Sequence, residues 1–149
     1  MAEIQFVVFK LGKEEYGVDI MQVKEIVPYK EPVKVPNTPN FIEGIINLRS
    51  EIIPIVNLKK RFNIPGEALN EDTRIIVMNI EAKQVGFIVD DASEVTTINE
   101  ENIETAPDII AGIERKYITG IGKIKDRILI LLDLDKLFSA KEKESLEAV

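Results

Sequence analysis

The chain has 149 residues, a formal net charge of −7, and neither cysteine nor histidine. Without these two residue types it cannot form disulfides or use thiol or imidazole catalysis, and it lacks the commonest zinc ligands. The acidic balance argues against nucleic-acid binding, because that binding depends on clustered lysine and arginine side chains. Most familiar catalytic machinery is therefore absent, and we expect no metal and no cofactor.

No segment of the sequence predicts insertion into a membrane. The longest aliphatic run, Ile128 to Leu132, is far too short to span a bilayer. Met1 to Lys10 lacks the basic segment and long apolar stretch of a secretory signal. We expect a cytoplasmic protein.

The N-terminal segment predicts a β-hairpin. Ile4 to Leu11 is rich in β-branched and aromatic residues, and Gly12 to Glu15 is a plausible turn before a second run. Apolar residues alternate from Tyr16 to Ile20, which predicts one buried and one partly wet sheet face. Val23 to Val27 fits a helical turn or a bent strand, and we favour the strand because the block is short and β-branched.

Prolines characterise the next segment, which contains Pro28, Pro32, Pro36 and Pro39. They exclude a regular helix and predict an extended crossing segment. Two mainly apolar runs, 45–48 and 52–56, then flank the polar trio 49–51, which predicts a tight hairpin. Pro54 indicates an edge or a bulge in the return strand, because proline has no amide donor.

The sequence contains an internal duplication. Phe41 to Phe62 returns 76 residues later as Tyr117 to Phe138, with seven of 22 positions identical. Phe6 to Val27 returns as Ile75 to Thr96. The aligned pairs include Gly17 with Gly86, Glu25 with Glu94, Gly44 with Gly120 and Ile52 with Ile128.

We interpret residues 1–149 as one domain with two pseudo-duplicated subdomains, the first repeat about 6–62 and the second about 75–138. A copy of this size is near the lower limit for an independent core, so we predict that the subdomains share apolar surface. Short strands with turns between them predict a mainly β fold of small barrels.

Asn63 to Asp72 separates the copies, and Asn99 to Asp108 is an acidic insertion in the second. Asp135 is the predicted N-cap of a short C-terminal helix, about 135–147, with Leu137 and Phe138 pointing inward.

Two carboxylate pairs raise an enzymatic alternative, a β-barrel that binds a metal or a small molecule. They are Asp90/Asp91 and Asp133/Asp135. Neighbours in a strand point to opposite faces, so Asp90 and Asp91 cannot easily share a proton or a metal. We favour turn and cap roles for all four residues.

Arg49 and the apolar pair Ile20 and Val23 each allow a structural or a functional interpretation. An arginine beside a tight turn offers five fixed donors to a partner's carboxylate or carbonyl, but it can equally be a solvated flank. Ile20 and Val23 lie beside charged residues and can mark a partner groove, although most β-branched residues are buried. The residue types alone favour the structural interpretation in both cases.

Three segments resemble the CheW-like domain family of chemotaxis coupling proteins. They are LGKEEYGVDIMQVKEI (11–26), NTPNFIEGIINLRSEIIPIVNL (37–58) and YITGIGKIKDRILILLDLDKL (117–137). The resemblance covers nearly the whole chain, and the motif N-T-P-x-F-I-x-G-x-x-N-L-R is specific. It implies two tandem SH3-like, five-stranded β-barrels packed together.

The resemblance also implies a function. Such proteins are non-catalytic adaptors that couple the cytoplasmic tips of transmembrane chemoreceptors to the regulatory domain of the histidine kinase CheA in a signalling array. From its 149 residues we expect neither a kinase module nor a receiver in this chain. The same module can also serve a pathway other than motility.

Residue by residue, Val23, Gly44 and Arg49 match positions of the receptor contact in this family, and Ile20 and Glu25 lie in the same block. The kinase contact is expected at the end of the first barrel, where Asn40, Phe41 and Glu43 are the candidates. Members usually have glycine where this chain has Ser50. Because Asp126 fills the same slot in the second copy, we infer a type I turn at Ser50.

Overall fold

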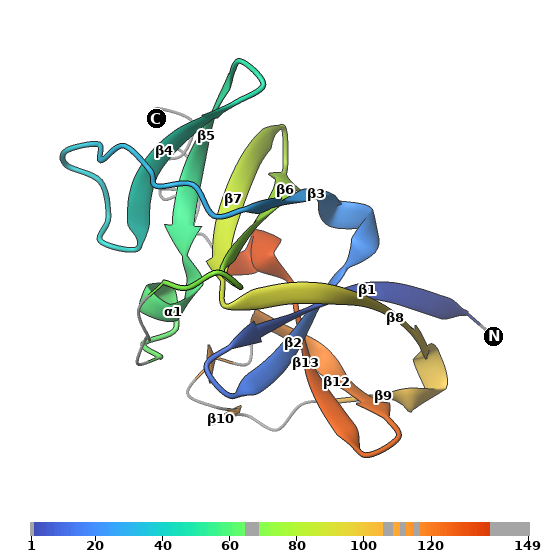
Figure 1. Cartoon of the computed structure of the whole chain (residues 1–149). Helices are drawn as coiled ribbons and strands as arrows, with labels where there is room; N and C mark the ends of the chain where they lie inside the picture. The colour runs from blue at the N-terminus through green and yellow to red at the C-terminus, as the bar shows by residue number, and fades with distance from the viewer. Residues whose placement is uncertain (1, 65–68, 106–108, 111–112, 115–116, 138–149) are drawn as a thin grey trace.

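The computed structural model describes residues 2–64, 69–105, 109–110, 113–114 and 117–137. Its strands form two main sheets, the upper and the lower one in Figure 1. The first sheet has the order β3-β6-β7-β5-β4, with β3 (Val23–Pro28), β6 (Arg74–Ile80), β7 (Lys83–Val89), β5 (Glu51–Asn57) and β4 (Ile42–Leu48). The second has the order β8-β1-β2-β13-β12-β9, with β8 (Asp91–Asn99), β1 (Glu3–Leu11), β2 (Glu14–Asp19), β13 (Arg127–Leu132), β12 (Ile118–Ile124) and β9 (Ile103–Glu104).

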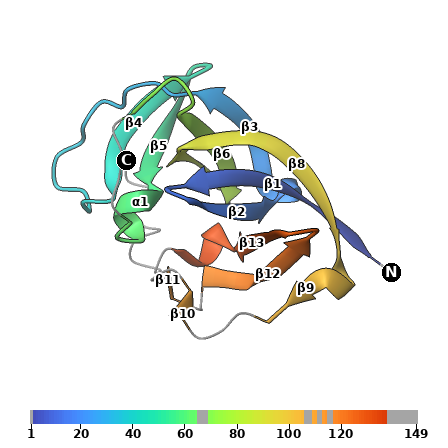
Figure 2. The ribbon, with the colours of Figure 1, turned by 60° about the horizontal axis from the view of Figure 1, so that its bottom comes forward.

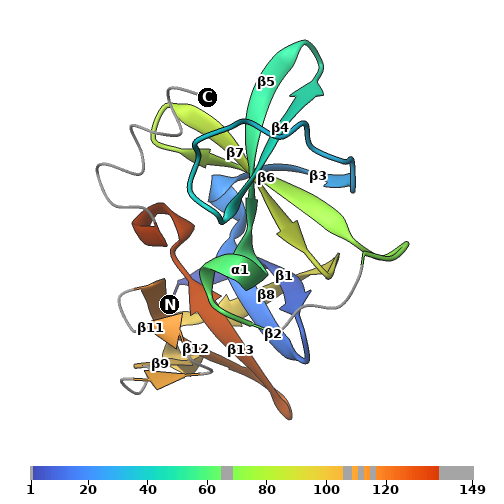
Figure 3. The same ribbon diagram turned by 90° about the vertical axis from the view of Figure 1, so that its left-hand side faces the viewer.

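Short elements connect these strands. They are η1 (Ile20–Gln22), α1 (Leu58–Arg61), η2 (Glu100–Asn102), the pair β10 (Ile109–Ile110) and β11 (Ile113–Glu114), and η4 (Leu134–Leu137). Figures 2 and 3 show the two sheets beside each other from two further directions, with α1 close to where they meet. The mainly β prediction is confirmed, and none of the described helices is long and apolar enough to cross a membrane.

The predicted hairpins and the crossing segment are present. β1 pairs with β2 and β4 with β5, both antiparallel. The chain from β3 to β4 has one isolated bridge, between Val33 and Ile45. Pro54 pairs with Ile45, while the parallel pairing of β5 with β7 begins at Ile55. The residue without an amide donor therefore lies where its strand has one partner.

The two sheets do not coincide with the two sequence copies. The first copy contributes β1 and β2 to the second sheet and β3 to β5 to the first. The second copy does the reverse, with β6 and β7 in the first sheet. Each copy therefore gives its first hairpin to the sheet built on the other, which differs from the expectation of one subdomain for each copy.

The exchange explains a glycine pair that the copies share. Across the parallel strands, Gly86 lies against Ile55, and Gly17 lies against Leu131, the residue equivalent to Ile55. A Cβ atom at Gly86 would be 2.6 Å from the Cδ1 atom of Ile55, and one at Gly17 would be 3.0 Å from a Cδ atom of Leu131. At these two positions of the register, glycine therefore leaves room for the aliphatic side chain of the other copy.

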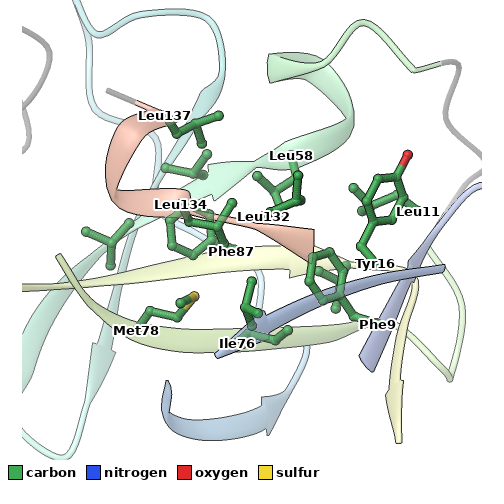
Figure 4. Close-up of a cluster of buried hydrophobic side chains, with 14 of the residues drawn as sticks. Phe9, Leu11, Tyr16, Leu58, Ile76, Met78, Phe87, Leu132, Leu134 and Leu137 are labelled. Atoms are coloured by element: carbon green, nitrogen blue, oxygen red, sulfur yellow. The ribbon is translucent and has the colours of Figure 1, made fainter. Parts of the chain in front are cut away.

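The largest apolar cluster lies between the sheets and includes Phe9, Tyr16, Met78 and Phe87, all nearly inaccessible (Figure 4). Alternate residues of the same strands belong to two further apolar clusters. One is on the first sheet and includes Ile75 and Val77, and the other is on the second sheet and includes Phe6 and Val8. The central strands are therefore covered on both faces. On β2, Tyr16 and Val18 are buried on one face. The other face has Gly17 buried between the half-buried Glu15 and Asp19, so the predicted partly wet face is present.

The C-terminal helix is described only at its start, where η4 is a 3-10 turn with Leu137 buried. The backbone amide of Asp135 donates to Oδ1 of Asp133 at 3.1 Å, so Asp133 takes the capping role that we predicted for Asp135. Phe138 and the rest of 135–147 lie outside the described residues. In the acidic insertion, β9 pairs with β12.

The shared core predicts a strong contrast between two methionines. We expect Met78→Ala to lower the free energy of unfolding by about 2–5 kcal/mol, because Met78 is fully buried between the sheets. The same change at Met21, which is 85% exposed, is expected to have an effect within about 0.5 kcal/mol. Urea unfolding followed by circular dichroism measures both, and equal effects would contradict a core shared at Met78.

Candidate partner-binding surface

β3 and the β4–β5 turn meet through an ion pair between Glu25 and Arg49. The Arg49 side chain is 70% exposed and that of Glu25 is 19% exposed. Hydrogen bonding to Glu25 raises the pKa of Arg49. Arg49 reaches this carboxylate through Nη1. The rest of its guanidinium faces solvent, where it can donate to a carboxylate or a carbonyl of a partner.

The second sheet contains an equivalent contact in which the arginine binds two carboxylates. Glu94, the equivalent of Glu25, accepts from both Nη atoms of Arg127 at 2.8 Å. Arg127 also donates to both carboxylate oxygens of Glu15, at 3.1 and 2.8 Å. Hydrogen bonding to Arg127 lowers the pKa of Glu94, whereas the two carboxylates raise that of Arg127. Arg127 therefore pairs with two carboxylates within the fold, whereas Arg49 pairs with Glu25 at the surface.

The turn that carries Arg49 is left-handed at both central residues, with φ of 51° at Arg49 and 68° at Ser50. This is the pattern of a type I′ turn, so the inferred type I turn is wrong. In the equivalent turn of the second copy the positive φ is at Lys125, not at Asp126. Asp126 is therefore no guide to the conformation that Ser50 must adopt.

Ile20 begins η1 and Val23 begins β3, on the connection from β2 to β3 that also contains Met21. Both are partly buried and pack against the core between the sheets. The turn is fixed by Asp19, whose Oδ1 accepts from the backbone amide of Met21 at 2.9 Å. Met21 itself is 85% exposed. Sequence reasoning missed it, because periodicity does not show which residue of a one-turn helix points outward.

Gly44 is buried beneath the crossing segment and has a φ of 146°. A Cβ atom there would lie 2.1 Å from the carbonyl oxygen of Val33. Gly120 in the second copy is crowded in the same way, with 2.7 Å between such an atom and Ile103. Gly44 therefore allows a close backbone crossing and is not itself an exposed contact.

Asn40, Phe41 and Glu43 lie at the opposite end of β4 from Arg49. Asn40 is exposed, whereas Phe41 is only 8% exposed. Glu43 forms an ion pair with Lys60 at 2.6 Å. The seven residues of β4 separate this end from the turn by roughly 20 Å at about 3.3 Å per residue.

The comparisons with known proteins agree with this architecture. A CheW-like domain is matched over residues 5–142 of the chain. The chain belongs to the CheW-like domain family. The chemotaxis protein CheW of Klebsiella aerogenes is 41% identical over 138 residues, which are 93% of this chain and 83% of that protein. CheW of Treponema pallidum is also 41% identical, over 148 residues that are 97% of this chain and 87% of that protein.

A solved CheW structure shows the same fold. The scaffolding protein TtCheW from Thermoanaerobacter tengcongensis superposes with a TM-score of 0.86 at 42% identity, covering 95% of this chain and 92% of that one. The two sheets are accordingly the two SH3-like barrels that the resemblance implied. CheW-like proteins of this kind are non-catalytic scaffolds, and the chain is not an enzyme.

The carboxylates of the enzymatic alternative have structural partners in this CheW-like chain. Asp90 forms an ion pair with Lys59 at 2.6 Å and accepts from the amide of Gly12 at 2.7 Å. Asp133 caps the turn at Asp135. Within the described residues no three acidic side chains gather as a metal site would require. Asp90 therefore has an ion-pair role and Asp133 has a cap role, and both roles are structural.

The left-handed turn makes a prediction about Ser50. Replacing it with glycine is expected to raise the free energy of unfolding by roughly 0.5–1 kcal/mol, because glycine adopts a positive φ without strain. The control is Asp126→Gly in the equivalent turn, where no positive φ is relieved and no gain is expected. Urea unfolding of both variants decides the matter, and a loss of stability in Ser50→Gly would show that the turn is not strained.

Proposed function

We propose that this chain is an adaptor that couples the cytoplasmic tips of transmembrane chemoreceptors to the regulatory domain of the histidine kinase CheA. Its CheW-like domain spans nearly the whole chain, and its relatives are named as chemotaxis and scaffolding proteins. The adaptor works in the cytoplasm and is recruited to membrane-associated receptor arrays. The single observation that carries the proposal is the pair of unlike barrels, of which one keeps an exposed arginine where the other has a closed ion-pair cluster.

The receptor surface consists of η1, β3 and the β4–β5 turn. Ile20 and Val23 supply apolar contacts on a rigid support, because both are anchored on the core between the barrels. Arg49 fixes the register of a helical receptor hairpin by donating to its carboxylates or carbonyls. Glu25 holds Arg49 in position through the ion pair. Gly44 contributes indirectly, because it leaves room for the backbone of the crossing segment at Val33.

The kinase surface is the far end of β4. Asn40 is its exposed candidate, and Phe41 and Glu43 hold the strand end in place through packing and the contact with Lys60. Because the two surfaces lie at opposite ends of one strand, two partners can bind at the same time. Simultaneous binding would let modest affinities add up in an array through effective concentration.

The decisive experiment compares equivalent charge reversals in the two copies. Arg49→Glu is expected to weaken binding to a receptor-tip fragment by roughly tenfold or more, because an exposed donor becomes a repelling carboxylate. Lys125→Glu, at the equivalent turn position of the second copy, is expected to leave receptor binding unchanged. Titrations followed by amide chemical shifts measure both affinities.

Binding to the isolated kinase regulatory domain serves as a second measurement on the same variants. It is expected to be unaffected by Arg49→Glu if the two surfaces are separate. Equal receptor affinities for Arg49→Glu and the parent chain would show that Arg49 is not part of the receptor site.

A further inference from the structure

Methionine supplies all the sulfur atoms of this chain that peroxide can oxidise. The sequence has three methionines and no cysteine, so the thiolate that peroxide usually oxidises is absent. Tryptophan and histidine are absent as well. The oxidation chemistry of the chain is therefore simple to follow.

Exposure separates the two methionines that the structure describes. Met21, the middle residue of η1, is 85% exposed, whereas Met78 is inaccessible in the core between the barrels. Oxidation of a thioether requires access by the oxidant, so the two sulfur atoms must differ greatly in reactivity.

The position of Met21 gives its oxidation a consequence. Ile20, the residue before it, and Val23, two residues after it, are partly buried against the core, so Met21 is the most exposed apolar side chain of this block. The hydrogen bond from its backbone amide to Asp19 fixes the turn that presents it. A flexible thioether is suited to packing on an apolar partner surface, and a sulfoxide is polar and poorly suited to it.

We propose that Met21 is a reversible oxidation site at which peroxide weakens the binding of the partner helix to η1 and β3. Peroxide transfers one oxygen atom to the thioether: the O–O bond breaks, an S–O bond forms, sulfur is oxidised to the sulfoxide and the peroxide is reduced to water. Methionine sulfoxide reductases reverse the step with electrons from a thiol reductant. The effect on binding rests on the proposed receptor surface, whereas the selective oxidation of Met21 does not.

The first experiment tests the selectivity on the full chain. Hydrogen peroxide is added, and peptide mass spectrometry follows the gain of one oxygen atom at each methionine. Met21 is expected to react at least about tenfold faster than Met78, because reactivity follows exposure. Similar rates at Met21 and Met78 in the folded protein would overturn the proposal.

The second experiment measures binding to a receptor-tip fragment before and after peroxide treatment, by the same amide chemical-shift titration. The oxidised parent chain is expected to bind roughly fivefold to tenfold more weakly, with recovery after reductase treatment. Met21→Leu cannot be oxidised at this position. Whatever its starting affinity, that affinity is expected to be the same with and without peroxide.

The outcomes separate the inference from the proposed function. If the untreated parent chain does not bind the receptor fragment, the proposed receptor surface fails, while the relative oxidation rates still decide the selectivity of Met21. If the untreated chain binds and oxidation at Met21 leaves its affinity unchanged, the proposal is overturned. An equal loss of affinity in peroxide-treated Met21→Leu would also overturn it, because the effect would then come from another residue.

Discussion

The exchange of the first hairpin between the two copies is the constraint on which the rest of this structure depends. β1 and β2 pair with strands of the second copy, and β6 and β7 pair with strands of the first. Neither copy can complete a barrel by itself. The strands at the crossing have apolar residues on both faces, since one face fills a barrel and the other fills the core between barrels. This accounts for the near-continuous apolar runs in the sequence and for the glycines at positions 17 and 86, where an aliphatic side chain of the other copy fills the space of a Cβ atom.

Within this symmetric frame, the two copies have diverged at equivalent places. Glu25 and Glu94 both bind an arginine of the neighbouring hairpin, but Arg127 lies between two carboxylates and Arg49 binds one at the surface. The edge of β4 is covered by the isolated bridge at Val33, and the edge of β12 is covered by β9 from the acidic insertion. The duplicated barrel therefore offers two unlike surfaces, as an adaptor between two different partners requires.

Rigidity connects these surfaces to the core. Ile20 and Val23 rest on the same cluster as Phe87 and Met78, so the candidate receptor surface is an extension of the packing between the barrels. The short turn η1 exposes Met21, while Ile20 before it and Val23 after the turn pack on the core. The proposed receptor contact and the proposed oxidation site thus both depend on η1, the short connection from β2 in the second sheet to β3 in the first.

The sequence by itself determined the strands, the hairpins, the duplication and the family, because these depend on local periodicity, turn residues and short motifs. It also identified Glu25 and Arg49 as residues of one candidate site. Only the tertiary structure decided that the copies exchange hairpins, that Gly17 of β2 lies against Leu131, and that Asp90 belongs to an ion pair with Lys59. It also decided that Gly44 is covered, that Ser50 is left-handed and that Met21 is exposed. These features depend on contacts between residues far apart in the chain, and local patterns contain no information about strand pairing beyond a hairpin.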